Sequence, residues 1–263
     1  MSNSRPEADL RPASAPGGSG AIWSADPYGE ATAEFYDLLA TAMWDEVGPA
    51  LPRLLSGLEP AQGAILDLGA GTGAGTGHIH AAFPLASIVA LEPSKAMRTA
   101  LNARLATNPS LRRAVTVVPR AFEDAELPLH LSGVVASAVI GHFDERGRQV
   151  LWKSLAGRLA PGAPALVSVL PPTRPELIPP TRYRSLPVGE FVYEGWMQGE
   201  PVDERRMVWT MSYRVLVGDD VVYERRAVSL WHTCGAADIA AEVAPLGLAV
   251  ERPDADHVVL RRS

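Results

Sequence analysis

The sequence predicts an α/β protein built on a doubly wound, mostly parallel β-sheet. Short apolar runs alternate with amphipathic stretches between residues 64 and 170, which is typical of parallel strands joined by helices that cover both faces. A glycine-rich turn follows the first apolar run. After the fifth run, Met207 to Trp231 alternate apolar with mostly polar residues around "GDD", which predicts a β-hairpin inserted after the fifth strand.

Composition limits the classes of protein to consider. The chain has 263 residues, 47% of them hydrophobic, and a net charge of -6, so we expect one elaborated domain. Its arginine pairs are scattered among acids, so we expect no nucleic acid as partner. No apolar stretch approaches the roughly 20 residues of a membrane span, so we expect no membrane association. With a single cysteine, Cys234, and no signal-type apolar run, we expect a soluble, cytoplasmic protein.

The N-terminal half divides into three parts. Residues 1–20 are rich in Ser, Pro and Gly and predict a disordered tail. Residues 21–56 carry apolar side chains at helical spacing, followed by prolines, and predict a cap of two helices. Residues 57–170 form the predicted core. Its expected strands are 64–68, 87–92, 115–119, 133–139 and 164–170, and its expected helices are 74–83, 94–106 and 144–159.

The C-terminal half departs from this alternation. A proline-rich link, residues 171–190, should continue neither strand nor helix. Together with the hairpin it makes an insertion over residues 171–232. We interpret this insertion as a lid over the part of a ligand site that takes the substrate, called the acceptor side below. Residues 233–263 predict a helix ended by glycine and two short strands that complete the sheet.

The glycine-rich turn indicates a nucleotide-type cofactor site. Residues without Cβ allow backbone amides to approach a ligand at a helix N-terminus. Glu92 ends the next strand, where an acid can accept both hydroxyls of a ribose. Asp67 lies within the first strand, where a buried carboxylate needs a partner such as a cation or backbone amides. The alternatives are an ordinary strand-to-helix turn and a nicotinamide or flavin site, which Asp67 disfavours because dinucleotide folds have apolar residues there.

At these motifs the sequence resembles the class I S-adenosylmethionine-dependent methyltransferases of the small-molecule type. The likeness rests on "ILDLGAGTG", "VALEPS" and "AFEDAELP" and extends over roughly residues 28–170. It implies a Rossmann-like core that binds S-adenosylmethionine and releases S-adenosylhomocysteine. Asp67 would hold the amino group of the cofactor and Glu92 its ribose. The implied cofactor-binding residues are Tyr28, Tyr36, Asp67, Gly69, Ala70, Gly71, Gly73, Glu92, Pro93, Ala121, Phe122, Glu123, Ser137 and Ala138.

Methyl transfer is an in-line displacement that needs a base only when the nucleophile must lose a proton. His142 follows the fourth strand, where the family often has a histidine, and is the candidate catalytic base; the alternative is a cap for the helix that begins near Asp144. His78 and His80 have no third ligand at metal spacing, so we expect no metal site. The expected acceptor-binding residues are the aromatic side chains Tyr183, Tyr193, Trp196 and Trp231.

The sequence therefore predicts an enzyme that moves a methyl group from S-adenosylmethionine to oxygen, nitrogen or carbon of a small, apolar metabolite, with secondary metabolism as its setting. Two rival interpretations stay open. One is an NAD(P)-dependent oxidoreductase, and the other is a cofactor-fold module that binds without turnover. The sequence leaves the oligomeric state open, with a homodimer as one alternative.

Overall fold

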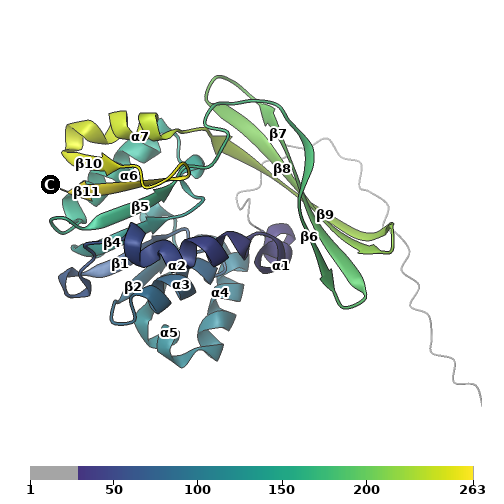
Figure 1. Cartoon of the computed structure of the whole chain (residues 1–263), viewed down its shortest axis with the longest axis horizontal. Helices are drawn as coiled ribbons and strands as arrows, with labels where there is room; N and C mark the ends of the chain where they lie inside the picture. The colour runs from purple at the N-terminus through teal and green to yellow at the C-terminus, as the bar shows by residue number, and fades with distance from the viewer. Residues whose placement is uncertain (1–28, 263) are drawn as a thin grey trace, which may run out of the picture.

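The computed structural model describes residues 29–262. A seven-stranded sheet flanked by helices lies at one end of the molecule, and a second, four-stranded sheet of long strands lies at the other (Figure 1). Helix α1 (Glu30–Leu39) lies between them. The predicted class, a mostly parallel α/β fold with an N-terminal helical cap and an antiparallel insertion, is confirmed.

The first sheet has the strand order β10-β11-β5-β4-β1-β2-β3. Strands β1 to β5 are mutually parallel, whereas β11 runs antiparallel to β5 and β10 antiparallel to β11. The chain runs from β1 outward to β3 and then returns to the other side of β1, so a crevice forms where the carboxyl ends of β1 and β4 diverge. The strands are β1 (Ala64–Leu68), β2 (Ile88–Leu91), β3 (Val115–Val118), β4 (Leu131–Ala136), β5 (Pro164–Ser168), β10 (Leu248–Glu251) and β11 (His257–Arg262).

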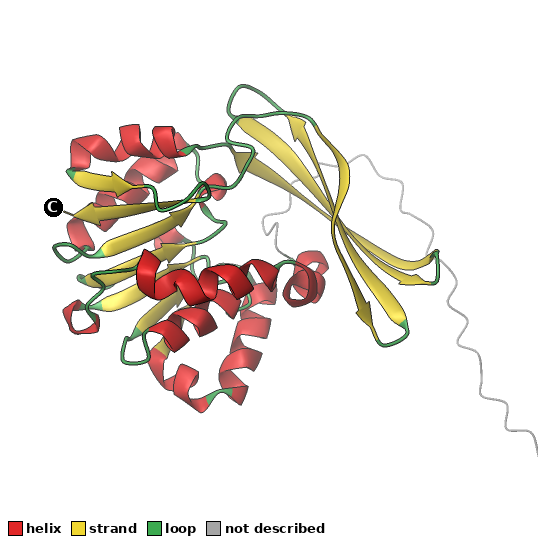
Figure 2. Ribbon diagram, in the orientation of Figure 1, coloured by secondary structure: helices red, strands yellow, loops and turns green. Residues whose placement is uncertain are grey.

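Helices cover both faces of this sheet (Figure 2). Alternate side chains of each strand point to opposite faces, so Ile65 packs with α2 and α3 while Leu66 packs with α6 and α7. The helices are α2 (Trp44–Leu54), α3 (Ala74–Ala82), α4 (Lys95–Thr107) and α5 (Pro109–Ala114) on one face, and α6 (Glu145–Arg158) and α7 (Ala236–Val243) on the other. Short 3₁₀ helices occupy Thr41–Met43, Pro60–Gln62, Phe122–Asp124, Ile140–His142 and Ala244–Leu246.

The second sheet is larger than the predicted hairpin. The hairpin is present as β8 (Arg206–Val217) and β9 (Asp220–His232), but β7 (Phe191–Pro201) and β6 (Ile178–Val188) extend it to four antiparallel strands. The prediction that the proline-rich link forms no strand is therefore wrong from Ile178 onward. Strand β6 is an edge strand, and an edge tolerates prolines because one side of it needs no backbone donors.

Helix α1 packs on one face of the second sheet through Phe35. This side chain is fully buried, and its ring stacks on that of Tyr213 with centroids 5.1 Å apart. The rings of Tyr193 and Tyr223 lie 5.9 and 6.1 Å from it. The Tyr223 hydroxyl also donates to the Glu34 carboxylate at 3.0 Å. The aromatic residues of the insertion thus form a packing surface for the N-terminal helix.

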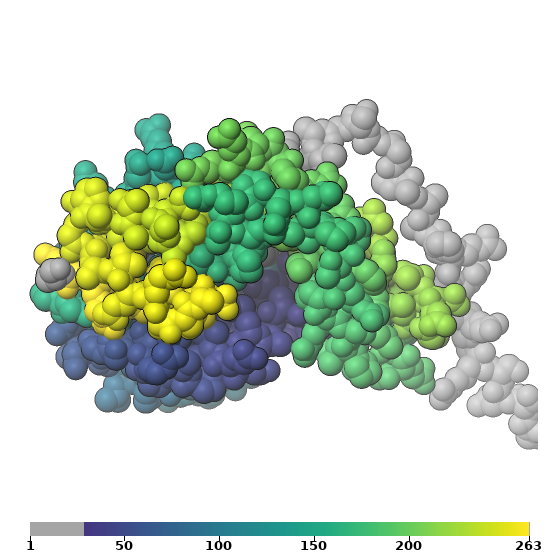
Figure 3. Space-filling view, turned by 45° about the horizontal axis from the view of Figure 1, so that its top comes forward, coloured from purple at the N-terminus to yellow at the C-terminus, as the bar shows by residue number. Residues whose placement is uncertain are grey.

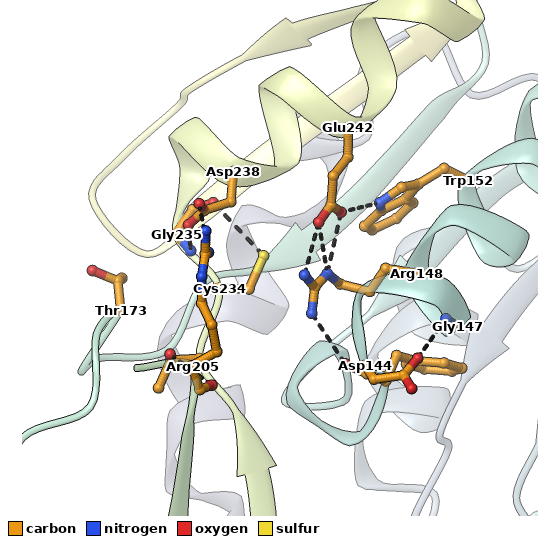
Figure 4. Close-up of polar contacts among 12 residues, drawn as sticks. Asp144, Gly147, Arg148, Trp152, Thr173, Arg205, Cys234, Gly235, Asp238 and Glu242 are labelled. Atoms are coloured by element: carbon orange, nitrogen blue, oxygen red, sulfur yellow. Dashed lines mark hydrogen bonds and ion pairs between the residues drawn. The ribbon is translucent and has the colours of Figure 1, made fainter. Parts of the chain in front are cut away.

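Helix α7 ties the second sheet to the core through Asp238 (Figure 4). Its carboxylate accepts hydrogen bonds from Arg174, in the link that leads to the insertion, and from Arg205, in the turn between β7 and β8. The same carboxylate accepts from the Gly235 amide at 2.8 Å. The Arg174 guanidinium is the main cause that lowers the pKa of Asp238.

A buried ion pair lies beside this junction. The Arg148 side chain of α6 is 5% exposed, and its guanidinium binds both oxygens of Glu242 on α7 at 2.7 to 3.1 Å (Figure 4). The Trp152 indole donates to the same carboxylate at 2.7 Å. Removal of one partner would leave the other charge buried and unpaired, which is costly.

We therefore expect Glu242→Gln to lower the free energy of unfolding by about 3 kcal/mol or more, measured by urea denaturation. The matched control is Glu251→Gln, which breaks the pair with Arg261 at a carboxylate that is 55% exposed. That change should cost about 1 kcal/mol or less. Equal losses in the two variants would contradict the structural role given to the Arg148 pair.

Candidate functional site

The glycine-rich turn lies at the crevice between β1 and β4. Gly69, Gly71 and Gly73 have positive φ angles of 71°, 57° and 81°, a region that favours glycine. A Cβ on Gly69 would lie 2.9 Å from Val139, and one on Gly73 would lie 2.3 Å from Leu101. A Cβ on Gly71 would meet only the Tyr36 ring, at 3.9 Å. The turn is thus packed at its two ends and open at Gly71.

The carboxylate of Glu92 fastens the turn to the end of β2. One oxygen accepts a hydrogen bond from the Gly71 amide at 2.8 Å, and the other accepts from the Ser94 amide at 2.7 Å. Glu92 is 6% exposed, and these bonds offset part of the cost of burying its charge. The structure thus places the Glu92 carboxylate in contact with the glycine-rich turn. Two further residues that the resemblance implied, Ala70 and Pro93, are the chain neighbours of Gly71 and Glu92.

Asp67 lies at the end of β1 and is 4% exposed. The buried carboxylate has a partner within the chain: the hydroxyl of Thr76 on α3 donates to it at 2.6 Å. Burial raises the pKa of Asp67 from 3.8 to about 7, against the lowering effect of the Thr76 hydrogen bond. The nearby Glu92 charge adds to the rise. A cationic group placed here would lower this pKa again.

Residues on α1 close the site from the N-terminal side. Tyr36 lies over Gly71. Burial is the main cause that raises its pKa to about 12. Asp37 accepts hydrogen bonds from the Thr72 hydroxyl and from Arg104 of α4, the latter at 2.8 Å. Sequence reasoning missed Asp37 and Thr72, although each is the neighbour of a predicted residue. Tyr28 lies outside the described residues.

The other predicted cofactor residues follow β3 and β4. Ala138 has a φ of 52°, which is strained for a residue with a Cβ, and its amide donates to the Ser168 hydroxyl at 2.6 Å. Ser137 precedes it. The Phe122 ring packs edge-on against Phe143 in the core, so only its backbone is left to border a ligand. Ala121 is half-buried and Glu123 is exposed.

A cavity of about 510 Å³ lies between α1, the second sheet and the carboxyl ends of β4 and β5. Figure 3 shows a recess between the green second sheet and the core, with the purple N-terminal helices at its base. Tyr183 and Trp231 line the cavity, as predicted, and Tyr36 and Ala138 line it on the side of the glycine turn. The remaining described lining is mostly apolar: Thr32, Leu39, Ala40, Ala42, Met43, Leu170, Pro171, Arg184, Met197, Trp209, Met211, Tyr213, Ala227 and Ser229.

Two predicted acceptor residues do not line this cavity. Tyr193 packs on Phe35 in the apolar cluster beside it. Trp196 is next to the cavity-lining Met197 in β7, so its side chain points to the opposite face of the sheet. There its indole donates to Glu194 at 2.8 Å, and the Arg214 guanidinium lies 5.1 Å from its ring centroid. Trp196 therefore lies outside the cavity, whereas Met197 and Trp209 line it.

His142 lies just after β4 and is partly buried. Its ring meets the Trp231 ring edge-on, with centroids 5.0 Å apart. Burial, and then the nearby His232, lower its pKa to about 4, so the ring is neutral near pH 7. The alternative role as a helix cap is wrong, because the Asp144 side chain caps α6 by accepting from the Gly147 amide at 2.7 Å.

Comparison with known proteins agrees with this geometry. The sequence profile of the family described as "Methyltransferase domain" matches residues 66–165, which extend from β1 to β5. The chain contains a methyltransferase domain. The match and the fold agree with the resemblance to the class I S-adenosylmethionine-dependent methyltransferases. A search of the curated proteins found no match to this sequence.

Solved structures share the fold across most of the chain. The CcbJ methyltransferase from Streptomyces caelestis has a TM-score of 0.70 at 18% identity, over 92% of this chain and 100% of that one. The S-adenosylmethionine-bound amino pentose methyltransferase CalS10 from Micromonospora echinaspora has a TM-score of 0.64 at 16% identity, over 83% and 89%. The sugar N-methyltransferase KedS8 from a Streptoalloteichus species has a TM-score of 0.63 at 16% identity, over 96% and 98%.

The residues of the crevice suit a methyltransferase. The positive-φ glycines, Glu92 and Asp67 gather at one crevice, and S-adenosylmethionine is the cofactor of this class. Among residues 29–262, no helix is long and apolar enough to span a membrane.

The raised pKa of Asp67 predicts a pH-dependent stability for the enzyme without cofactor. Between pH 3.8 and about 7 the folded protein keeps a proton on Asp67 that the unfolded chain has lost, so this contribution to stability declines as pH rises. Asp67→Asn keeps an acceptor for Thr76 and cannot ionise. Between pH 5 and pH 8, the free energy of unfolding of the variant should rise by about 2 to 3 kcal/mol relative to that of the native enzyme, measured by urea denaturation.

The control for this experiment is Asp203→Asn. Hydrogen bonds from Arg205 and Arg206 lower the pKa of Asp203, so it is ionised in the folded and the unfolded state alike over this range. Its effect on stability should therefore stay constant from pH 5 to pH 8. A constant effect of Asp67→Asn as well would show that Asp67 is ionised in the free enzyme.

Proposed function

We propose that the enzyme transfers a methyl group from S-adenosylmethionine to a small, apolar metabolite that lies in the cavity between α1 and the second sheet. One observation carries this proposal. Tyr36 and Ala138 line the cavity, and Tyr36 also covers Gly71 in the glycine-rich turn. The cofactor crevice and the cavity thus share a wall, which is the arrangement that an in-line displacement requires.

Three residues of the chain have separate roles at the cofactor site. Glu92 holds the turn through the Gly71 amide and offers carboxylate oxygens toward a ribose. Asp67, which is buried beside the turn, pairs with the cationic amino group of the cofactor. Tyr36 excludes water from above. When bound, S-adenosylmethionine supplies an activated methyl group on a sulfonium, so proximity and exclusion of water are the protein's main contributions.

The acceptor side is apolar. Met197, Trp209, Met211 and Trp231 line it from three strands of the second sheet, and such walls bind an acceptor chiefly by burying its apolar surface. The similar solved structures described as sugar N-methyltransferase and amino pentose methyltransferase support a small-molecule acceptor and a role in secondary metabolism. The N-methyltransferase among them favours nitrogen over oxygen and carbon as the methylated atom.

The test compares two tryptophans on opposite faces of the second sheet. A screen of small-molecule extracts with isotope-labelled S-adenosylmethionine, read by mass spectrometry, would first identify a methylated product. Trp231→Ala removes a cavity wall, so kcat/KM for that acceptor should fall about tenfold or more while the Kd for S-adenosylhomocysteine stays within about twofold. Trp196→Ala, on the outer face, should leave both values near native. The reverse pattern would place the acceptor outside the cavity.

We assign His142 a positioning role in place of the predicted role as base. It is not among the described residues that line the cavity, and it reaches the cavity through its contact with Trp231. A residue that fixes a wall acts on acceptor binding, whereas a base acts on the chemical step.

His142→Ala should therefore raise KM for the acceptor severalfold with kcat changed by less than about tenfold. His142→Phe, which keeps a flat ring against Trp231, should restore most of the lost binding. If His142 is the base, both variants should instead lower kcat by about 10² to 10⁴ at unchanged cofactor affinity. Steady-state kinetics at saturating S-adenosylmethionine separate the two outcomes.

A further inference from the structure

The acceptor cavity has one charged side chain among its described lining residues. This residue is Arg184 of β6. It is exposed, so its guanidinium borders the cavity on the side that solvent reaches. The other polar lining residues carry hydroxyl or indole groups, and none of the described lining residues is an acid.

No acid of residues 29–262 forms an ion pair with Arg184, whereas most of the other arginines in its sheet have an acidic partner. On the outer face, Arg182 binds Glu194 at 2.5 Å and Arg214 binds Glu224 at 2.9 Å. The other arginines of the second sheet also have partners: Arg206 with Asp203, Arg226 with Glu224, and Arg225 over the ring of Tyr223. Arg184 and Arg225 are therefore the two arginines of this sheet without an acidic partner among residues 29–262, and of these two only Arg184 lines the cavity.

An unpaired guanidinium beside an apolar cavity favours an acceptor with an anionic group. A guanidinium is planar and presents parallel N–H donors that match the two oxygens of a carboxylate. The acceptor would shield this pair from water, which strengthens it relative to a fully solvated pair. A phosphate group carries about two negative charges near pH 7 and would call for further cations. The described lining offers only one.

We propose that the natural acceptor is an apolar molecule bearing a carboxylate, which pairs with Arg184 while the apolar part lies against Met197, Trp209 and Met211. This inference rests on the proposed function, because it takes the cavity to be the acceptor site. It names a specificity-determining residue: Arg184 selects acids over neutral molecules of the same shape.

The test uses matched probes and needs no turnover. Binding of 2-naphthoate, 2-naphthamide and 2-naphthyl phosphate is measured by calorimetry on the full chain saturated with S-adenosylhomocysteine. The native enzyme should bind 2-naphthoate at least tenfold more tightly than 2-naphthamide. Arg184→Gln should abolish this preference through weaker binding of the acid alone. Arg226→Gln removes another exposed arginine, on the outer face, and should keep the preference.

Three results would overturn the proposal. They are equal binding of acid and amide by the native enzyme, an acid preference that survives in Arg184→Gln, and tighter binding of 2-naphthyl phosphate than of 2-naphthoate. S-adenosylhomocysteine titrated into the same enzymes before they are saturated with it distinguishes this failure from failure of the proposed function. Normal cofactor binding without an acid preference would contradict the carboxylate acceptor alone. Absence of cofactor binding in the native enzyme would contradict the proposed methyl transfer as well.

Discussion

The site depends on the packing of helix α1 between the two sheets. Phe35 fills the aromatic face of the second sheet and is fully buried there. Two residues further on, Asp37 binds Thr72 of the glycine-rich turn and Arg104 of α4. One short helix therefore sets the distance between the cofactor crevice and the acceptor wall. Burying an aromatic ring of this size contributes about 2 to 3 kcal/mol, so displacement of α1 would cost both the helix contact and the shape of the cavity.

Two buried acids prepare the cofactor crevice in advance. Glu92 is compensated by backbone amides of the turn that it holds, and Asp67 is compensated by a single hydroxyl. Burial raises the pKa of Asp67, and the hydrogen bond from the Thr76 hydroxyl offsets only part of that rise. This property of Asp67 suits a site that binds a cation. A buried carboxylate destabilises the free enzyme when it is ionised, and a positively charged ligand would offset that destabilisation.

The core elements and the inserted hairpin followed from local pattern, and the other two strands of the insertion, β6 and β7, did not. Apolar runs such as 64–68 are buried on both sides in the structure, which is why they could be read as parallel strands. Helix α5 was missed because it has only six residues and lies between two predicted elements. Strand β6 was missed because its prolines argue against a strand unless the strand is known to be an edge. The placement of Trp196 could not be predicted because strand β7 was not predicted, and in that strand Trp196 alternates with the cavity-lining Met197.

The sequence by itself determined the fold class, the glycine-rich turn, and the identities of Asp67 and Glu92, because each depends on residues that are close in the chain and on conformations that few residue types allow. Only the tertiary structure decided which aromatic side chains face the cavity, what partners Asp67 has, and that Arg184 alone among the described lining residues carries a charge. These features depend on contacts between segments more than a hundred residues apart, such as Phe35 with Tyr213. The register of one sheet and the docking of one helix fix them, and no local pattern encodes either.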